Sequence, residues 1–587
     1  MRTPYLRFDF RNPEDGSRPL EFTNPLRVLT AGNLAEVRGV FDAVEQALAG
    51  GHTVAGFVSY EAAPAFRPEL KAHDGKGFPL VWFAVFEAPA VLETTDFSED
   101  GIYRVSDWQM TSSEQDYTDA VHSIRQAIKQ GTTYQVNYTE RLTAAFEGDD
   151  RAFYNQLLRN QQADYSAYLD TGRYRILSAS PELFFRVADG RITAKPMKGT
   201  APRGRTTAED DRQAANLRAS QKEQAENLMI VDLLRNDISR LARPGTVQVS
   251  ALFETETYPT VHQLTSTVEA VIRPELSVFD WFAALFPCGS ITGAPKASTM
   301  RHINTLEQTP RNVYCGAIGY ITPEKQAVFN VPIRTVLIDS ATGMATYGVG
   351  GGITWDSTPE GEYAELAAKA RLLTERRPAF ELLESLLLDD GKYPHLTRHL
   401  ARLADSARYF RFSPPAVRAV TCLEELAEQF PAGVYKVRLL CNKEGECRAE
   451  AVPLGGLPVP VRCVLARTPV DSANPFLYHK TTNRTIYDEQ MAQADTAAFS
   501  VLLWNERNEL TEFTIGNIVI ERDGRLLTPP VDSGLLPGVF RQQLLDTKEI
   551  EENVLHIEDL AAADRIWLIN SVRGWVPAEV HLMEEGD

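Results

Sequence analysis

The sequence has 587 residues, of which 43% are hydrophobic and 24% charged, so it is too long for one simple core and predicts two or more globular domains. The net charge of -19 argues against the clustered Lys and Arg that nucleic-acid grooves and anionic membranes require, so we expect no nucleic acid and no membrane as partners. The N-terminus lacks the plan of a signal peptide and charges interrupt every long apolar run, which favours a cytoplasmic protein.

The predicted elements begin with short strands. The runs 52–61 and 78–89 are apolar and bounded by turn residues, which is typical of strands. The segment 114–130 opens with acidic residues, carries apolar residues at helical spacing and ends at Gly131, which predicts a helix. Strands, helices and turns then alternate up to a helix at about 360–377.

Changes in composition mark the domain boundaries. A proline follows the basic helix end near residue 377, and the segment 452–460 holds two Gly and three Pro, which predicts a linker between two lobes. We expect an α/β (α+β) protein with an N-terminal subdomain at 1–110, a catalytic domain at 111–376, a small lobe at 377–455 and a large lobe at 456–587.

The first candidate site combines a lysine with carboxylates. Lys198 lies in a turn next to Gly and Pro residues, where a lone lysine is usually a solvated charge and becomes a nucleophile only if its pKa is depressed. Two Glu pairs at i, i+3 spacing occur on separate predicted helices: Glu223 with Glu226, and Glu362 with Glu365. Such pairs are usually solvated, but two that converge could bind Mg²⁺ through oxygen.

Glycine-rich loops strengthen the case for a ligand. The run YGVGGGITWD at 347–356 has three consecutive glycines, which suit a close approach of backbone to a ligand. The run CGSITGAPKAS at 288–298 has a similar plan, with Thr292 and with Lys296 at an expected helix start. Arg334 lies in an apolar run, where a guanidinium requires a carboxylate partner.

Nine ordered sequence blocks over roughly 200 residues resemble the chorismate-utilising enzymes, the family that includes anthranilate, aminodeoxychorismate and isochorismate synthases. The blocks are ASPELFFRV, KPMKGT, ENLMIVDLLRNDISRLA, YPTVHQLTSTV, GSITGAPK, RNVYCGAIGY, VPIRT, GVGGGI and EYAELAAKA. The resemblance implies the family's fold of β-sandwich and helices. TGAPK favours an aminating member, and Lys198 within P-M-K-G-T favours the aminodeoxychorismate synthase branch, because anthranilate synthases usually have a small residue there.

The resemblance also implies roles for individual residues. Mg²⁺ on Glu226 and Glu365, supported by Glu223 and Glu362, would bind the ring carboxylate of chorismate. Lys198 would attack C2 while Glu182 serves as general acid for the departing C4 hydroxyl, and ammonia would then enter at C4. The remaining substrate contacts are expected from Arg334, Tyr314, His262, Thr292, Lys296, Gly351 and Gly352. The family usually has E-T where this chain has Glu365-Leu366.

The ammonia needs a source. A glutaminase requires a nucleophilic cysteine in a tight elbow with a histidine partner, and none of the six cysteines has that context. We therefore expect a separate glutamine amidotransferase subunit as a partner.

A second candidate site lies in the C-terminal part. Lys480 ends an aromatic and apolar run just before a predicted helix, and 509–545 reads as a hairpin followed by a Gly-Pro-Gly turn into another helix, whose start suits a phosphate. Each piece alone would be an ordinary hairpin or capped helix. Their order resembles the class IV aminotransferases, or fold-type IV pyridoxal phosphate (PLP) proteins, through HLARLADSARYF, HKTTNR, ELTEFTIGNI and GLLPGVFR.

This second resemblance implies a two-lobed PLP domain. Lys480 would bind the cofactor covalently and move protons, and Glu512 would pair with the pyridinium nitrogen. The phosphate grip is expected from Arg402, Gly516, Asn517, Gly538 and Val539. The usual first strand and D-R-G segment are missing, so the small lobe is shortened, and a homodimer through this domain is common in the family.

Three readings follow from the two resemblances. The leading one is a bifunctional enzyme that aminates chorismate and then expels pyruvate to give 4-aminobenzoate. In the second, the C-terminal part is a catalytically silent module, which the short lobe favours and Lys480 with Glu512 oppose. In the third, the first part is an anthranilate synthase, which Lys198 opposes.

Overall fold

A computed structural model of the chain describes residues 3–11, 18–75, 77–92, 97 and 101–581. The chain forms two compact units: Met1–Pro202 with Ala214–Arg377, and Arg203–Gln213 with Pro378–Asp587. The break after Arg377 lies one residue beyond the predicted end of the catalytic domain, whereas no feature of the sequence predicted that Arg203–Gln213 belongs to the second unit. None of the described helices is long and apolar enough to cross a membrane.

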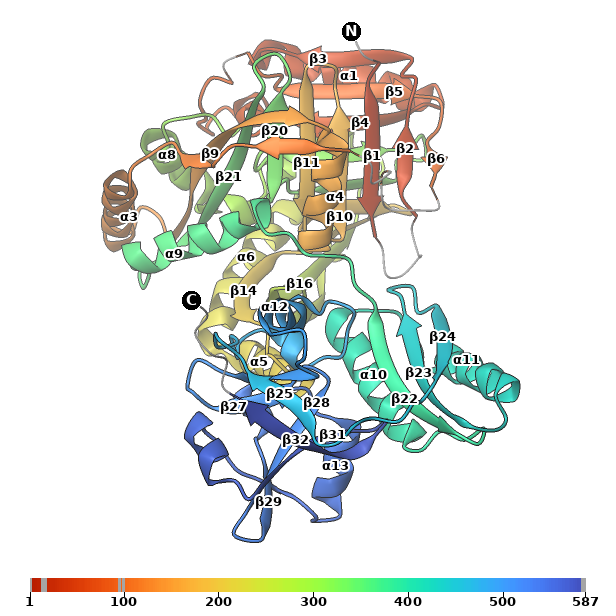
Figure 1. The fold of residues 1–587 in the computed structure, drawn as a ribbon. Helices are drawn as coiled ribbons and strands as arrows, with labels where there is room; N and C mark the ends of the chain where they lie inside the picture. Colours follow the sequence, from red (N-terminus) through yellow and green to blue (C-terminus); the bar gives the residue numbers. More distant parts are fainter. Residues whose placement is uncertain (1–2, 12–17, 76, 93–96, 98–100, 582–587) are drawn as a thin grey trace. The chain divides into compact units, whose positions relative to one another are not determined.

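The first unit contains two large, mostly antiparallel sheets (Figure 1). The first, the β9 sheet, runs in the order β17 (Gly293–Ala294), β9 (Gln135–Gly148), β21 (Met344–Ile353), β20 (Thr335–Asp339), β11 (Tyr174–Ser180), β10 (Tyr165–Asp170), β1 (Tyr5–Phe10), β2 (Leu20–Phe22) and β6 (Ala90–Val91), with β7 (Tyr103–Val105) and β8 (Gln109–Met110) paired to β9. The second, the β16 sheet, runs in the order β14 (Met197–Pro202), β16 (Val261–Val271), β13 (Arg191–Ala194), β12 (Leu183–Ala188), β19 (Ala327–Asn330), β18 (Ala317–Ile321), β4 (Thr53–Val58), β5 (Val81–Phe86) and β3 (Arg27–Ala31), with β15 (Gln248–Thr257) paired to β16.

The two sheets pack face to face and helices cover their outer faces. One core lies between the sheets, where Phe8 of β1 and Phe57 of β4 belong to the same buried cluster. A second core joins the β16 sheet to α1 (Leu34–Ala49), α6 (Gln221–Ser239) and α7 (Val278–Leu285). A third joins the β9 sheet to α3 (Glu114–Lys129), α4 (Asp150–Gln161) and α9 (Pro359–Ala370). The short α2 (Ala63–Phe66) and α8 (Lys296–Leu306) complete the helices of this unit, and α5 (Thr207–Ala219) spans the change of unit.

Local sequence signals set these elements. The predicted strands at 52–61 and 78–89 are confirmed as β4 and β5. The helix predicted at 114–130 is confirmed as α3, which begins at a capping box between Ser113 and Asp116. The helix predicted to carry Glu223 and Glu226 is confirmed as α6, which ends at Ser239 and whose first turn is capped by the Ser220 hydroxyl.

The second unit has a small sheet and a barrel. The sheet β22 (Leu382–Asp389), β23 (Val434–Cys441) and β24 (Cys447–Pro453) packs against α10 (Leu396–Phe410) and α11 (Ala416–Gln429). The other strands run in the order β27 (Leu510–Phe513), β26 (Ser500–Trp504), β25 (Val461–Leu465), β32 (Gly574–His581), β31 (Arg565–Asn570), β28 (Gly516–Arg522), β29 (Arg525–Thr528) and β30 (Glu551–Glu552). Because β27 also pairs with β28, the first six strands close on themselves as a barrel, and α12 (Thr485–Gln493) and α13 (Val539–Asp546) lie outside it (Figure 1).

A buried ion network holds the first unit together. Glu307, just after α8, accepts hydrogen bonds from Arg311 at 2.6 and 3.0 Å, from Arg141 of β9 at 3.2 Å and from the Thr139 hydroxyl at 2.7 Å. Burial alone would raise the pKa of Glu307, but the two arginines outweigh it and lower the value. The network thereby fixes β9 to the loop that carries Tyr314, whose ring lies 5.3 Å from the Arg141 guanidinium.

We predict that Glu307→Ala destabilises the first unit by about 3–5 kcal/mol, because it leaves two buried guanidinium groups without their carboxylate. Scanning calorimetry on the full chain measures the loss as a lower transition temperature. Glu275→Ala, at an exposed position whose pairing with Arg273 spans 4.0 Å, is the control and should stay within about 0.5 kcal/mol of wild type. Equal stability of Glu307→Ala and the control would contradict the prediction.

Candidate functional site

Lys198 is presented by a β-bulge. The pairing of β14 with β16 shifts register between Met197 and Thr200, and Gly199 within the bulge has a positive φ of 100°. The Asn227 amide of α6 donates to the Lys198 carbonyl at 3.2 Å and to the Leu264 carbonyl at 3.1 Å, so it holds the bulge against the helix. The bulge therefore aims the Lys198 side chain away from the regular strand.

The three glycines of β21 form the surface that Lys198 faces. A Cβ added to Gly352 would lie 3.2 Å from the Lys198 ammonium and 2.0 Å from the Gln135 amide nitrogen. A Cβ at Gly351 would lie 3.0 Å from a Glu362 oxygen and 3.7 Å from a Glu365 oxygen. The absence of side chains on this strand thus lets the lysine and the α9 carboxylates approach the same stretch of backbone.

The predicted carboxylate pairs occupy α6 and α9. Burial and the neighbouring Glu223 raise the pKa of Glu226, while Lys198 lowers it. Burial likewise raises the pKa of Glu362. Glu365 is paired with Lys369, which holds its pKa below the usual range despite partial burial. Glu365 of α9 also raises the pKa of Glu226 on α6, and Lys198 lowers the pKa of both groups, so the two helices face one site.

The donor set suits a hard cation. All four groups are oxygen ligands, the type that Mg²⁺ binds, and neutralisation by a divalent cation would relieve the repulsion among them. Within the described residues, however, no group of three or more His, Cys, Asp or Glu side chains is already close enough to hold a metal. The carboxylates therefore fit the ion chemically, and each helix would contribute ligands after side-chain adjustment.

Glu182 has the properties of an acid–base group. It is buried, and burial raises its pKa to about 7, against lowering contributions from the Ser290 hydrogen bond and from Lys198. One of its carboxylate oxygens has no hydrogen-bond partner among the described residues. A carboxyl group that titrates near neutral pH beside a lysine can deliver a proton in its vicinity.

Two of the residues predicted to contact a substrate anion, Arg334 and Tyr314, lie near β21. Arg334 lies between β19 and β20 with a positive φ of 53°, not inside a strand, and its guanidinium contacts the Gln161 side chain at 3.3 Å. It still contributes to the lowered pKa of Glu365, which places it near the carboxylates. The Tyr314 ring packs directly over Gly348 of β21, at 2.3 Å from where a Cβ would stand.

The other predicted contacts are engaged within the protein. Lys296 begins α8 as expected, but its buried ammonium pairs with Asp237 at 2.8 Å and donates to the Leu285 carbonyl at 3.1 Å. The Thr292 hydroxyl donates to the carbonyls of Cys288 and Gly289. His262 is buried on β16, across from Ala201, and contacts the Thr257 hydroxyl. Lys296 and Thr292 thus shape the 288–296 loop.

Sequence reasoning missed three residues of this site. Lys369 donates to the Gly350 carbonyl at 2.7 Å and pairs with Glu365, and its helical spacing of four from Glu365 could have revealed it. Gln135 and Asn227 carried no sequence signal, because their partners lie far away along the chain.

The second site is built around Lys480. Burial lowers the pKa of Lys480 to about 8, with Arg402 and Arg484 acting in the same direction. Glu512 on β27 is also buried, and burial raises its pKa to about 7. The Tyr487 hydroxyl donates to Glu512 at 2.8 Å and the Asn517 amide donates to it at 3.3 Å, so its orientation is fixed.

The expected phosphate grip is assembled at the start of α13. Arg402 of α10 donates to the Pro537 carbonyl at 3.1 Å, which places its guanidinium beside Gly538. Gly538 is the N-cap of α13 and supplies no side-chain cap, so the first N–H groups of the helix, beginning at Val539, are available to an anion. A Cβ at Gly538 would lie 2.0 Å from the Asn517 side-chain oxygen. These features fit the phosphate of PLP.

Comparison with known proteins finds a different family for each of two parts of the chain. Residues 93–375 match the family model "chorismate binding enzyme", and residues 381–580 match "amino-transferase class IV". One part of the chain is thus similar to the chorismate-binding enzymes, and the part that follows it is similar to the class IV aminotransferases.

The first domain has relatives of two kinds. It is 39% identical over 288 residues to aminodeoxychorismate synthase component 1 of Escherichia coli, covering 49% of this chain and 63% of the relative. It is 38% identical over 261 residues to anthranilate synthase component 1 of Methanothermobacter marburgensis, covering 44% of this chain and 56% of the relative. The chain therefore spans less than two thirds of these relatives. The crystal structure of anthranilate synthase component I from Streptococcus pneumoniae matches with a TM-score of 0.53 and 26% identity, over 60% of this chain and 91% of that one.

Glu384 anchors the second site through a buried ion pair. It accepts from Arg402 at 2.9 and 2.7 Å and contacts the His399 ring at 2.7 Å. Burial alone would raise its pKa, but Arg402 and His399 lower it to about 2. Because the folded pKa is depressed, the pair stabilises the fold above the ordinary carboxyl pKa, and this stability is lost as the pH falls towards about 2.

We predict that Glu384→Gln lowers the stability of the second unit near neutral pH by about 3–5 kcal/mol, since Arg402 is left buried without a counter-charge. Calorimetry between neutral and acid pH should show that the gap between the variant and wild type narrows on acidification. The exposed Glu424→Gln on α11 is the control. A gap that is absent, or that does not depend on pH, would refute the assignment.

Proposed function

We propose that this protein makes 4-aminobenzoate from chorismate in two steps. The first unit replaces the C4 hydroxyl of chorismate with an amino group, and the second expels pyruvate from the resulting 4-amino-4-deoxychorismate. The observation that carries the proposal is the position of Lys198, directed at the glycines of β21 among the α6 and α9 carboxylates, with Glu182 beside it.

In the first step, Lys198 acts as a nucleophile. Its neutral amine attacks C2 of the ring while the C4 hydroxyl leaves, and both ring double bonds shift by one position. Glu182 gives its proton to the departing oxygen, a role that a carboxyl pKa of about 7 permits. Ammonia then attacks C4, both double bonds shift back and the lysine amine leaves C2, so that the enzyme is restored.

Charge in the site positions the substrate. Mg²⁺ held by Glu226 and Glu365, with Glu223 and Glu362 in support, would neutralise the ring carboxylate of chorismate. Arg334 and the backbone N–H groups of β21 glycines suit the enolpyruvyl carboxylate, with Tyr314 against the strand. His262, Thr292 and Lys296 act indirectly in this proposal, by holding β16 and the 288–296 loop.

In the second step, PLP supplies an electron sink for the substrate carbon. Lys480, with a pKa of about 8, is suited to hold the cofactor and then to take the C4 proton of the substrate. Glu512 would pair with the ring nitrogen of PLP, and Arg402 with Gly516, Asn517, Gly538 and Val539 would hold its phosphate. Loss of the proton and of pyruvate makes the ring aromatic, which drives the step forward.

Two alternatives are disfavoured by particular residues. A silent C-terminal module has no need of a lysine and a carboxylate that are both buried and shifted towards neutral pKa values. If the first part were an anthranilate synthase, Lys198 would have no role in the reaction. Because no cysteine of the chain has the sequence context of a glutaminase nucleophile, we assign the ammonia to a separate glutamine amidotransferase subunit.

The products of lysine variants test both steps. With chorismate, Mg²⁺, PLP and ammonium, wild type should yield 4-aminobenzoate by chromatography. Lys198→Ala should yield neither product, and Lys480→Ala should stop at 4-amino-4-deoxychorismate, because each variant lacks the amine of one step. The half-buried Lys195→Ala, whose partner is Glu256, is the control and should resemble wild type. Anthranilate as the product would overturn the first assignment, and accumulation of 4-amino-4-deoxychorismate by wild type would overturn the second.

The pH dependence of amination tests Glu182. As a general acid with a pKa of about 7, it is protonated below that pH, so the rate at constant free ammonia should fall as the pH rises through about 7. Glu182→Gln should slow amination by about 10²–10⁴-fold and remove this limb of the profile. The exposed Glu254→Gln should keep both the rate and the limb. An unchanged limb in Glu182→Gln would exclude this role.

A further inference from the structure

The segment Arg203–Gln213, here called the clasp, follows the Lys198 strand in sequence yet packs as part of the second unit. Its turn is tight: the Asp210 carboxylate accepts from the Arg203 guanidinium at 2.6 Å and from the Gly204 N–H at 2.9 Å. A Cβ at Gly204 would lie 2.1 Å from the Asp210 nitrogen, so the turn requires glycine. These contacts therefore give the clasp a defined conformation.

The clasp is bound to α10. The Thr207 hydroxyl donates to Asp405 at 2.7 Å, and Asp211 receives both arms of Arg408 at 3.0 Å. The Arg203 guanidinium donates to the Tyr409 carbonyl at 2.8 Å. In return, the Tyr409 hydroxyl donates to the Gly204 carbonyl at 2.7 Å. The same helix carries Arg402, the residue expected at the phosphate.

A stack of three side chains leads from the clasp to Lys480. The Arg203 guanidinium lies 4.3 Å from the centre of the Tyr409 ring, and that ring stacks on His479 at 4.2 Å with 27° between the planes. His479 is also contacted by the Ser406 hydroxyl at 3.1 Å. Burial lowers the pKa of His479 to about 3, so its ring is neutral and adds no charge beside Lys480.

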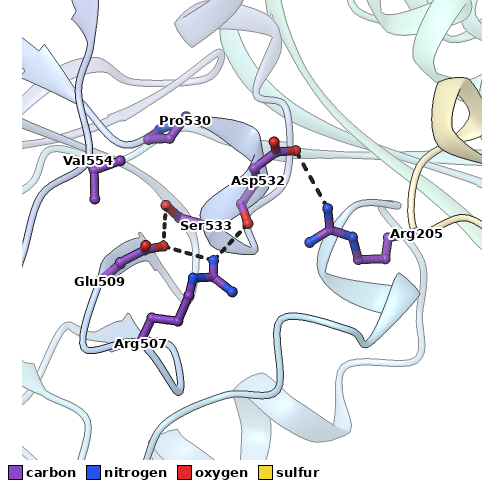
Figure 2. Close-up of a pocket in the computed structure, with 7 residues that line it drawn as sticks. All are labelled: Arg205, Arg507, Glu509, Pro530, Asp532, Ser533 and Val554. Atoms are coloured by element: carbon purple, nitrogen blue, oxygen red, sulfur yellow. Dashed lines mark hydrogen bonds and ion pairs between the residues drawn. The ribbon is translucent and has the colours of Figure 1, made fainter.

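A second contact secures the residue before His479. Arg205 of the clasp donates to the Tyr478 hydroxyl at 3.1 Å and pairs with Asp532 at 3.7 Å. Figure 2 shows Arg205 and Asp532 pointing towards one another across a pocket that Arg507, Glu509 and Ser533 also line. None of the residues expected to hold PLP lines this pocket, so the link from Arg205 towards Lys480 runs through the Tyr478 side chain.

We propose that the clasp is a positioning element of the cofactor site, in which Arg203 sets the place of Lys480 through Tyr409 and His479. This inference rests on the proposed function, because it assumes that Lys480 holds PLP. Ser406 and Tyr409 follow Arg402 at spacings of four and seven residues, so the three side chains lie on one face of α10. This face therefore carries both the expected phosphate contact and the two residues that contact His479. Arg203 braces that face at its C-terminal end.

PLP titration of the full-length apo protein tests the proposal. The readouts are the visible absorbance and circular dichroism of bound PLP, with chorismate amination assayed on the same samples. Arg203→Ala should weaken PLP binding about tenfold and change the dichroism, because the stack loses its outer member. Asp211→Ala is the matched control, since it belongs to the clasp but forms only an exposed pair with Arg408. It should bind PLP as wild type does.

A second variant keeps the proposal testable if Arg203→Ala does not fold. Tyr409→Leu preserves an apolar side chain on α10 but removes both stacking contacts, and should reproduce the change in dichroism. Wild-type affinity and dichroism in either folded variant would overturn the proposal. If wild-type protein itself gives no visible band, the proposed function of the second unit fails instead, so the two failures are distinguishable.

Discussion

Buried charge, and the need to pair it, is the constraint on which both units depend. Glu307, paired with both Arg141 and Arg311, fixes β9 to the Tyr314 loop. Lys296 with Asp237 fixes the start of α8, and Glu384 with Arg402 fixes α10 to the small sheet. Each pair is enclosed by protein, where an unpartnered charge would be far more costly than in water. The chain can therefore adopt few other arrangements without exposing these groups, and the backbone around both sites is correspondingly rigid.

The groups that the fold leaves incompletely neutralised are the ones that suit catalysis. Lys198 offsets the burial of Glu182 only in part, as Lys480 and Arg484 do for Glu512, so burial raises the pKa of each carboxyl group to about 7. Burial lowers the pKa of Lys480 to about 8. Such shifts cost folding energy, since the charged forms are disfavoured without compensation. Groups with pKa values near neutral pH exchange protons readily. Burial, which requires most charges to be paired, therefore also gives the unpaired groups the pKa values that acid–base catalysis needs.

The sequence predicted the local features of this protein better than its non-local ones. The strands β4 and β5, the helix α3 and the helix start at Lys296 follow from periodicity and capping, which are short-range effects. The role of the Lys296 side chain, in contrast, depends on a distant residue, because its partner Asp237 lies 59 residues away. The sequence alone therefore could not distinguish the expected substrate contact from a buried ion pair. Gln135 reaches the Gly352 backbone across more than two hundred residues, and no pattern in the sequence announces it.

The clasp shows why domain boundaries read from composition are incomplete. The sequence places a boundary near residue 377, where a proline follows a basic helix end, and the first of the two compact units ends at Arg377. Arg203–Gln213 has no such sequence signal. The chain leaves and re-enters the first unit within a charged, turn-rich stretch whose sequence is like that of a surface loop. A fragment that begins at Pro378 would lack these residues, and with them the hydrogen bonds to Tyr409 and Tyr478. The second unit is therefore complete only in a chain that also contains Arg203–Gln213.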